Sequence, residues 1–153
     1  MCQRPLRSGC IETKTKLPSS PTSVGAARRF VRDVLLHRHV NQKAVETVEL
    51  LTSEVVTNAL VHARSVEADP AEGPDLVVRI GRGFVRVEVY DVSPAVPVRR
   101  SPDPLDPSGR GMWIVDELSR DWGVDHLPRG KRVWFEVAFR ISPLAAWGRG
   151  RAS

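Results

Sequence analysis

The chain has 153 residues, which suits about one domain of ordinary size and excludes a second complete one. Hydrophobic residues make up 41% of the sequence and charged residues 27%, as in soluble globular proteins, so wholesale disorder is excluded. The formal net charge is +5, but residues 1–20 contribute +3, residues 141–153 contribute +2, and the segment between them is neutral. Basic tails are usually solvated ends, so we expect no direct nucleic-acid contact.

The cysteine positions and the hydropathy of the sequence indicate the cellular compartment. Cys2 and Cys10 lack the close Cys and His pairs of a structural zinc site. No apolar run approaches the ~18 residues that a membrane-spanning helix needs. We therefore expect a cytoplasmic, reduced protein that has no zinc site and does not enter the membrane.

The first predicted elements are a short edge strand and two helices. The strand is expected within residues 9–18, and a breaker cluster rich in Pro and Ser separates it from a helix over 24–40. A second helix is expected over 41–63, with Asn41 as its N-cap. One stripe of this helix is apolar and predicts the buried face: Val45, Val48, Leu51, Val55, Ala59 and His62.

Two strands and a proline-rich segment follow the second helix. The strands are expected over 76–80 and 84–90, joined by residues 81–83, which have the glycine content of a tight hairpin. Five prolines between residues 92 and 108 exclude regular structure there. A loop this long inside one domain is typical of a lid, a binding loop or a linker.

The last predicted elements are a short helix within 109–124 and two strands, over 122–127 and 133–141. Met112, Val115 and Leu118 or Ser119 share one face of that helix.

This order of helices and adjacent strands favours the α+β class. We expect a two-layer sandwich in which a mixed, largely antiparallel sheet is covered on one face by helices. The domain is expected over 20–141, preceded by an N-terminal tail over 1–19 and followed by a C-terminal tail over 142–153.

Glu54 and Asn58 stand out on the second helix, because they lie four residues apart at the edge of its apolar stripe. One interpretation is a boundary hydrogen-bond pair. The other is that Asn58 offers its carbonyl oxygen to Mg²⁺ while Glu54 orients or deprotonates a nucleophile.

Two further features have a structural and a functional interpretation. Asp91 ends a strand, where its carboxylate either caps a turn or accepts a hydrogen bond from an exocyclic amine. Gly109 and Gly111 flank Arg110 at the start of a helix, where free N–H groups favour phosphate. The alternative for these glycines is a flexible hinge of the lid.

Four segments taken in order resemble a known family: ELLTSEVVTNALVHA (49–63), VEVYDVSP (87–94), GRGMWIVDELSRDWGV (109–124) and GKRVWFEV (130–137). They are similar to the N box, the two glycine boxes and the final strand signature of the GHKL-type, histidine-kinase-like ATPase fold. The branch that they resemble includes anti-sigma factor serine/threonine kinases. The resemblance covers about residues 20–140.

The resemblance implies a role for each matching residue. Asn58 would bind Mg²⁺, Glu54 would act as the general base, Asp91 would bind the adenine amino group, and Lys131 lies in the GK of the last signature. Residues 92–108 would form the ATP lid. The segment that would hold the phosphates opens the third helix: Gly109, Arg110, Gly111 and Met112.

The resemblance also implies a function, namely Mg-ATP-dependent phosphorylation of a Ser or Thr on an anti-anti-sigma partner of the STAS type. Sequestration of a sigma factor and formation of a homodimer are further implied roles. Asp91 is followed by Val92, Ser93, Pro94 and Ala95, so both glycines of the usual D-x-G-x-G are missing. This departure keeps an alternative open, an ATP-gated protein-binding module without phosphotransfer.

Overall fold

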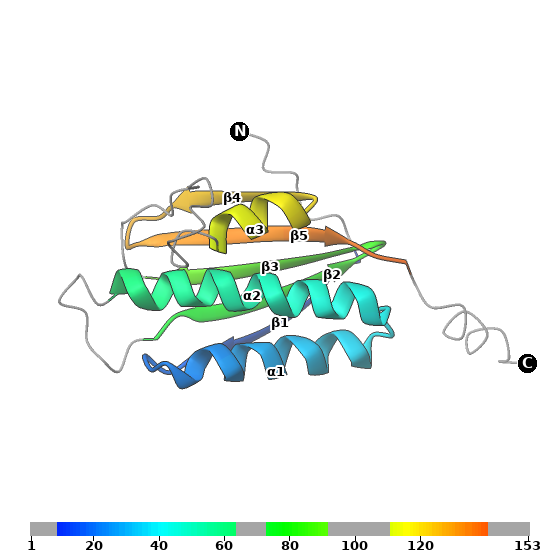
Figure 1. Ribbon diagram of the computed structural model, residues 1–153, viewed down its shortest axis with the longest axis horizontal. Coiled ribbons are helices and arrows are strands. Elements are labelled where there is room, and N and C mark those ends of the chain that lie inside the picture. The colour runs from blue at the N-terminus through cyan, green and yellow to red at the C-terminus, as the bar shows by residue number, and fades with distance from the viewer. Residues whose placement is uncertain (1–8, 64–72, 92–110, 141–153) are drawn as a thin grey trace, which may run out of the picture.

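The structure is a computed structural model that describes residues 9–63, 73–91 and 111–140. Its elements, in chain order, are β1 (Ile11–Lys16), α1 (Thr22–His37), α2 (Gln42–Ala63), β2 (Asp75–Gly81), β3 (Phe84–Asp91), α3 (Gly111–Leu118), β4 (Asp121–His126) and β5 (Lys131–Ala138). The strands form one sheet in the order β1-β2-β3-β5-β4, and the helices lie together on one face of it (Figure 1). This confirms the two-layer α+β prediction, with a sheet that is antiparallel at every pairing rather than mixed.

The first helix ends three residues before its predicted end. His39 adopts a left-handed conformation with φ of 58°, which stops the helix. The N–H of Val40 donates to the Leu35 carbonyl at 3.1 Å and that of His39 donates to the Leu36 carbonyl at 3.1 Å, as in a Schellman motif. Val40, expected inside the helix, instead follows this turn and is buried.

Helix α2 matches the predicted range, but its predicted N-cap differs in detail. The backbone carbonyl of Asn41 accepts from the Val45 N–H at 3.1 Å, as an N-cap residue does. Its side-chain Oδ1 is buried and has no hydrogen-bond partner among the described residues. The stripe from Val45 to Ala59 is buried as predicted, and the side chain of His62 lies outside the description.

The C-terminal elements differ from prediction by a few residues. β5 begins two residues before the predicted start, because Lys131 already pairs with Asp91 of β3, and it ends at Ala138 instead of residue 141. Met112 and Val115 of α3, predicted to share a face, are both buried. Of the two alternatives for the third position, Leu118 is 49% exposed and Ser119 is half-buried.

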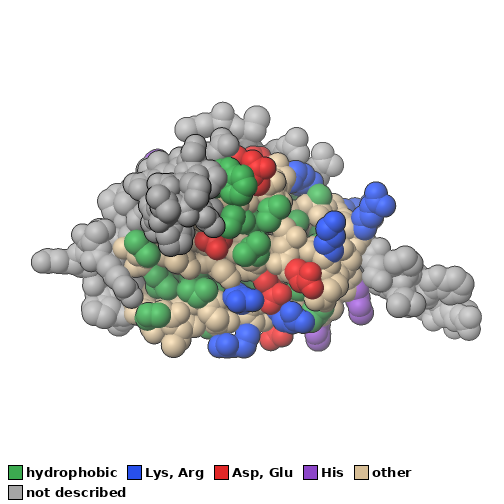
Figure 2. Space-filling model, viewed as in Figure 1, with side chains coloured by type: hydrophobic (Ala, Val, Ile, Leu, Met, Phe, Trp, Pro, Cys, Tyr) green, Lys and Arg blue, Asp and Glu red, His purple; other side chains and the backbone are tan. Residues whose placement is uncertain are grey.

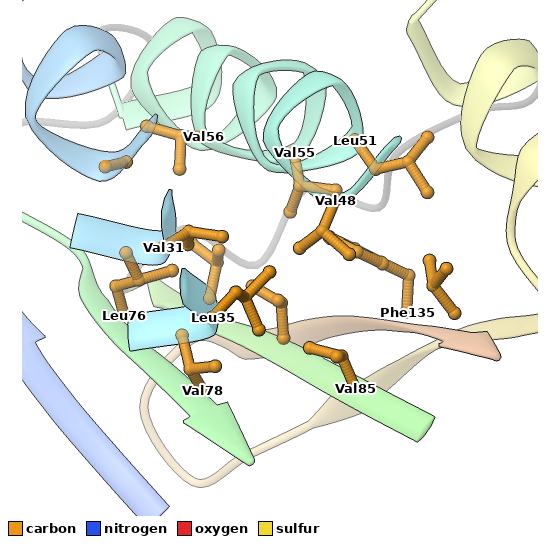
Figure 3. Packing of buried hydrophobic residues seen from close by; sticks show 14 of the residues in the cluster. Val31, Leu35, Val48, Leu51, Val55, Val56, Leu76, Val78, Val85 and Phe135 are labelled. Atoms are coloured by element: carbon orange, nitrogen blue, oxygen red, sulfur yellow. The ribbon is translucent and has the colours of Figure 1, made fainter. Parts of the chain in front are cut away.

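The core lies between the helices and the sheet. Figure 3 shows Val31 and Leu35 of α1 and four α2 residues facing side chains of β2, β3 and β5. In β2, β3 and β5 the alternate positions that face the helices are apolar, as a half-covered sheet requires, except for Asp91 at the end of β3 and Lys131 at the start of β5. The core positions labelled on the strands are Leu76, Val78, Val85 and Phe135.

The outer surface of the helices is mixed in character. Figure 2 shows this side of the molecule, where basic and acidic side chains alternate over the helices and a group of apolar side chains lies among them. Within the described part of the chain, no helix combines the length and the apolar character that crossing a bilayer would require.

Candidate functional site

Glu54 and Asn58 lie one turn apart on α2, at the margin of the face that packs on the sheet. Leu51, Val55 and Ala59 on that face are buried, whereas Glu54 and Asn58 are half-buried. Burial removes water from the carboxylate and raises the pKa of Glu54 above its ordinary value. A carboxylate with a raised pKa is a better proton acceptor, which suits a general base.

The carboxylate of Glu54 reaches the first residue of α3. A Cβ atom added to Gly111 would lie 2.5 Å from Glu54 Oε2, so glycine leaves the room that this oxygen occupies. The first N–H groups of a helix have no partner within the helix, and its N-terminus carries a partial positive charge. The contact therefore brings an acid and an anion-attracting helix end together.

Asp91 and Lys131 form a second pair, on adjacent strands. They are register partners at the end of β3 and the start of β5. The Nζ atom of Lys131 lies 3.4 Å from Asp91 Oδ1 and 3.3 Å from Oδ2. Asp91 is 8% exposed and Lys131 is 1% exposed, so this is a buried ion pair.

Both pairs lie on the helix-covered side and toward one end of the domain. Asp91 and Lys131 alternate with the core residues Val89 and Val133 along their strands and so share their face. The start of β5 and the C-terminal half of α2 lie at the same end of the molecule (Figure 1). Helix α2 contacts β3, β5 and α3.

The remaining predicted phosphate-binding residues divide into two groups. Gly109, Arg110 and the predicted lid over 92–108 lie outside the described residues. The side chain of Met112 is 3% exposed and belongs to the core, so a nucleotide could meet this residue only through its backbone.

The side chains of this site suit a metal ion that binds together with phosphate groups better than a metal ion held by protein ligands alone. In residues 9–63, 73–91 and 111–140, no three His, Cys, Asp or Glu side chains gather into a metal-binding group. Mg²⁺ commonly takes one or two protein oxygens together with phosphate oxygens and water. The amide oxygen of Asn58 is a suitable donor of this kind.

A charged cluster on the opposite, open face of the sheet was not foreseen from the sequence. Glu88 of β3 is 1% exposed, and its carboxylate accepts from Arg86 Nε at 2.7 Å and from the Tyr90 hydroxyl at 2.7 Å. Arg79 Nε lies 3.5 Å from the same carboxylate, and Arg132 Nη1 lies 4.0 Å from it. We call these five residues the Glu88 cluster.

The Glu88 cluster extends along the open face. Arg86 lies over the Trp134 ring at 3.9 Å and also donates to Glu136 at 3.2 Å. Arg132 donates to Asp125, and the hydrogen bonds to Tyr90 and Asp125 together with the charge of Glu88 raise its pKa despite partial burial. The signal in the sequence is the alternation of charged and apolar residues along β3 and β5, which predicts one polar face.

Two cavities lined by described residues lie away from both pairs. One, of about 480 Å³, lies on the open face beside β1, and its lining includes Lys14, Arg79 and Tyr90. The other, of about 560 Å³, lies where α2 begins and β5 ends, and its lining includes Asn41, Leu118 and Phe139. Neither is lined by Glu54, Asn58, Asp91 or Gly111.

Comparisons with known proteins bear on the fold and the family. Residues 17–137 match the model of the histidine kinase-like ATPase domain. Among solved structures, the chain is similar to the RsbU and RsbW domains of Rv1364c from Mycobacterium tuberculosis, with a TM-score of 0.65 and 17% identity. The likeness covers 84% of this chain and 32% of that one, so this chain spans about a third of that protein's length. No curated protein sequence gives a significant match.

The family match includes every described element except β1 and the last residue of β5, and it confirms the resemblance that the four sequence segments predict. It also contains all the site residues that the structure describes: Glu54, Asn58, Asp91, Gly111, Met112 and Lys131. ATP binding is what such a domain implies. The chain therefore belongs to the histidine kinase-like ATPase domain family.

Proposed function

We propose that this protein is an Mg-ATP-binding regulator of the anti-sigma factor kinase type, which phosphorylates a Ser or Thr of a partner protein. The observation that carries the proposal is the contact of the Glu54 carboxylate with Gly111 at the start of α3, one turn from Asn58. A base, a metal ligand and a helix N-terminus thereby lie together. These are the groups that a phosphoryl transfer needs.

Each residue has a role that follows from its chemistry. Asn58 would hold Mg²⁺ through its amide oxygen, and the backbone of residues 109–112 would hold the phosphates. Asp91 would accept from the adenine amino group. Bound Mg-ATP would supply the phosphoryl group and a cation that offsets its charge. Glu54, whose pKa is raised by burial, would accept the proton of the target hydroxyl.

The partner proposed for this reaction is an anti-anti-sigma protein of the STAS type, with a sigma factor as a second binding partner and a homodimer as the assembly. These proposals rest on the family resemblance of the four segments. The contact between Glu54 and Gly111 supports only the chemistry common to them, a nucleotide-dependent transfer to a hydroxyl.

Substitution of Asn58 tests the metal and nucleotide site. We expect Asn58→Ala to abolish Mg-dependent ATP binding, measured by isothermal titration calorimetry with and without Mg²⁺, because it removes the protein's oxygen ligand. The matched control is Thr57→Ala, an exposed neighbour on the same helix, which should bind ATP as the parent does. Full retention of Mg-dependent binding in the Asn58 variant would refute the assignment.

An ATP-gated binding module without phosphotransfer is the second candidate, and the missing glycines after Asp91 favour it. Glycines let a backbone approach a nucleotide closely, and Ser93 and Ala95 stand in their places here. Incubation with γ-labelled ATP and a STAS-type protein separates the candidates. Transfer of label to the partner requires the kinase, whereas ATP-dependent association without transfer supports the module.

A further inference from the structure

The cavity where α2 begins and β5 ends lies at the end of the domain away from Asp91 and Lys131 (Figure 1). Its volume of about 560 Å³ falls within the range of ~300–1,000 Å³ that is usual for binding clefts. More than half of its lining residues are apolar, namely Ala44, Leu118, Val137, Ala138 and Phe139. We call this cavity the distal groove.

The apolar lining of the distal groove is partly open to solvent. Leu118 is exposed, although Met112 and Val115 of the same helix are buried. Phe139 is partly buried and packs against the core. A single exposed leucine is normal on a protein surface, but a leucine that lines an apolar groove offers area that a docked side chain would bury.

Both charged residues in the lining of the distal groove are basic. Lys43 lies in the first turn of α2, and Arg140 follows the end of β5. Both are exposed, and neither forms an ion pair with any described residue. The acids nearest to the groove in the sequence are Glu46, which accepts from Gln42 at 3.1 Å, and Glu117, and neither lines it.

Two neighbouring turns add further positive charge at this end of the domain. Arg38 lies in the turn that leads into α2, three residues before the lining residue Asn41. The Gly83 carbonyl accepts from the N–H of Phe139 at 2.9 Å, which places the hairpin of Arg82 beside the groove. Arg38 and Arg82 are exposed and have no ion-pair partner within residues 9–63, 73–91 and 111–140. Cations gathered around a hollow attract an anionic partner.

We propose that the distal groove binds an acidic, amphipathic segment of a partner protein. An apolar side chain of the segment lies against Leu118 and Phe139, and its carboxylates meet Lys43 and Arg140. Amphipathic segments commonly bind in this way, with the apolar face in a groove. A protein segment fits better than a nucleic acid, because the lining is mainly apolar. The inference goes beyond the proposed function and uses none of the residues of the nucleotide site.

The test selects binders from a phage-displayed library of random short peptides on the full-length wild-type protein, after depletion of the library on Leu118→Asp. We expect the selected peptides to combine acidic residues with at least one large apolar residue. Their equilibrium dissociation constants are then measured by fluorescence anisotropy, without nucleotide. The constant should rise about tenfold or more in Leu118→Asp, and also in the double variant Lys43→Glu with Arg140→Glu.

The matched control is the double variant Lys14→Glu with Arg129→Glu. It makes the same change in net charge at exposed residues away from the groove, on β1 and in the turn before β5. It should change the dissociation constant by less than about twofold, because distant exposed charges are screened by salt. Circular dichroism checks that each variant is folded, and the changes at exposed positions leave the core intact.

Three results would overturn the proposal. The selected peptides could lack an excess of acidic residues, or they could bind both groove variants as tightly as the wild type. The control variant could also weaken binding as much as the groove double variant, which would indicate a general attraction of acidic peptides to a basic chain.

Two other occupants of the groove give different results, and each overturns the proposal. If the groove joins two copies of this chain, Leu118→Asp lowers the molecular mass measured by sedimentation equilibrium. If the groove meets a membrane, the wild type co-sediments with vesicles of phosphatidylglycerol and phosphatidylcholine, whereas Leu118→Asp does not. Failure of the proposed function is separate, since a protein that binds no ATP can still bind the selected peptides.

Discussion

Strand β3 carries two buried carboxylates, Glu88 and Asp91, whose surroundings differ. They lie three positions apart, so the alternation of a strand sends Glu88 to the open face and Asp91 to the helix-covered face. Glu88 accepts charge-assisted hydrogen bonds at 2.7 Å, and Arg79, Arg86 and Arg132 surround it. Asp91 meets the ammonium of Lys131 at 3.3 and 3.4 Å.

These different surroundings suggest different roles: Glu88 suits a structural role, and Asp91 suits contact with a ligand. The guanidinium groups of the Glu88 cluster are planar forks around one carboxylate, with Arg86 at 2.7 Å, Arg79 at 3.5 Å and Arg132 at 4.0 Å, and together they join β2, β3 and β5. The contact between Asp91 and Lys131, at 3.3 Å, is longer than that between Glu88 and Arg86, and its two residues belong to the predicted nucleotide site. We expect the first region to govern stability and the second to govern nucleotide binding.

The largest effect is expected from Glu88→Ala. It would leave the surrounding arginines without their buried acid, and breaking a buried pair in this way typically costs about 3–5 kcal/mol of unfolding free energy. Urea denaturation followed by circular dichroism measures the loss. The control is Glu12→Ala, whose carboxylate lies 2.8 Å from the same Arg79 but is 44% exposed, so its loss should be under about 1 kcal/mol.

Nucleotide affinity of the folded Glu88→Ala protein should match that of the wild type. If Glu88→Ala lost ATP affinity while its stability was unchanged, the open face of the sheet would be part of the nucleotide site. The proposed difference in role between the two faces would then be wrong.

The next effect is expected from Gly111→Ala at the site. The added Cβ would displace the Glu54 carboxylate, and because that atom is the end of a flexible side chain, stability should change by under about 1 kcal/mol. Transfer of label from γ-labelled ATP should nevertheless fall about tenfold or more, since a misplaced base is a poor one. Gly25→Ala in α1 is the matched control, with only the Arg29 side chain 3.4 Å from its Cβ position, and its transfer rate should be unchanged. Transfer at the wild-type rate in the Gly111 variant would argue against Glu54 as the base.

Much of this fold could be predicted from the sequence, because its signals are local. The apolar stripe of α2 and the glycines around Arg82 predict a helix and a hairpin within a few residues of those observed. The early end of α1 could not be predicted, because a left-handed His39 is a property of the turn and not of hydrophobic spacing. The exposure of Leu118, the last residue of α3, could not be predicted from hydrophobic spacing either.

The candidate site could be predicted only in part. The spacing of Glu54 and Asn58 on one helix indicates their shared side, and family resemblance names Asp91 and Gly111. The approach of Glu54 to Gly111 and the pairing of Asp91 with Lys131 depend on contacts between elements far apart in the chain. Sheet register decides which charges meet, and no periodicity in a single strand determines the register of its neighbour.

A smaller effect is expected from Arg86→Lys on the open face. Lysine keeps the charge but loses the planar group that lies over Trp134 and reaches both Glu88 and Glu136. We expect a loss of about 1–2 kcal/mol in unfolding free energy, with ATP affinity unchanged. Lys16→Arg, at an exposed pair with Asp75, controls for exchange between the two basic residues and should have no measurable effect. An Arg86 variant as stable as the wild type would show that charge alone holds the cluster.

The smallest effect is expected from the pH dependence of Glu54→Gln. Burial raises the native pKa of Glu54 above 4.5, so the folded state holds this proton more tightly than the unfolded state does. The resulting contribution to stability is fully present below about pH 4.5 and is lost as pH rises through the native pKa.

Glutamine carries no such proton, so Glu54→Gln should be more stable than the wild type at pH 7–8, and this advantage should shrink toward pH 4.5. Urea denaturation across that range measures it, and Glu117→Gln, at an exposed acid of α3, controls for the loss of one negative charge. An advantage at neutral pH combined with lost phosphotransfer would mean that a destabilised carboxylate is kept for its chemistry, in contrast to Glu88, whose removal only weakens the fold. A Glu54→Gln variant that is less stable than the wild type at every pH would contradict this prediction. Glu54 would then have a structural role, as Glu88 does, and would hold α2 and α3 together.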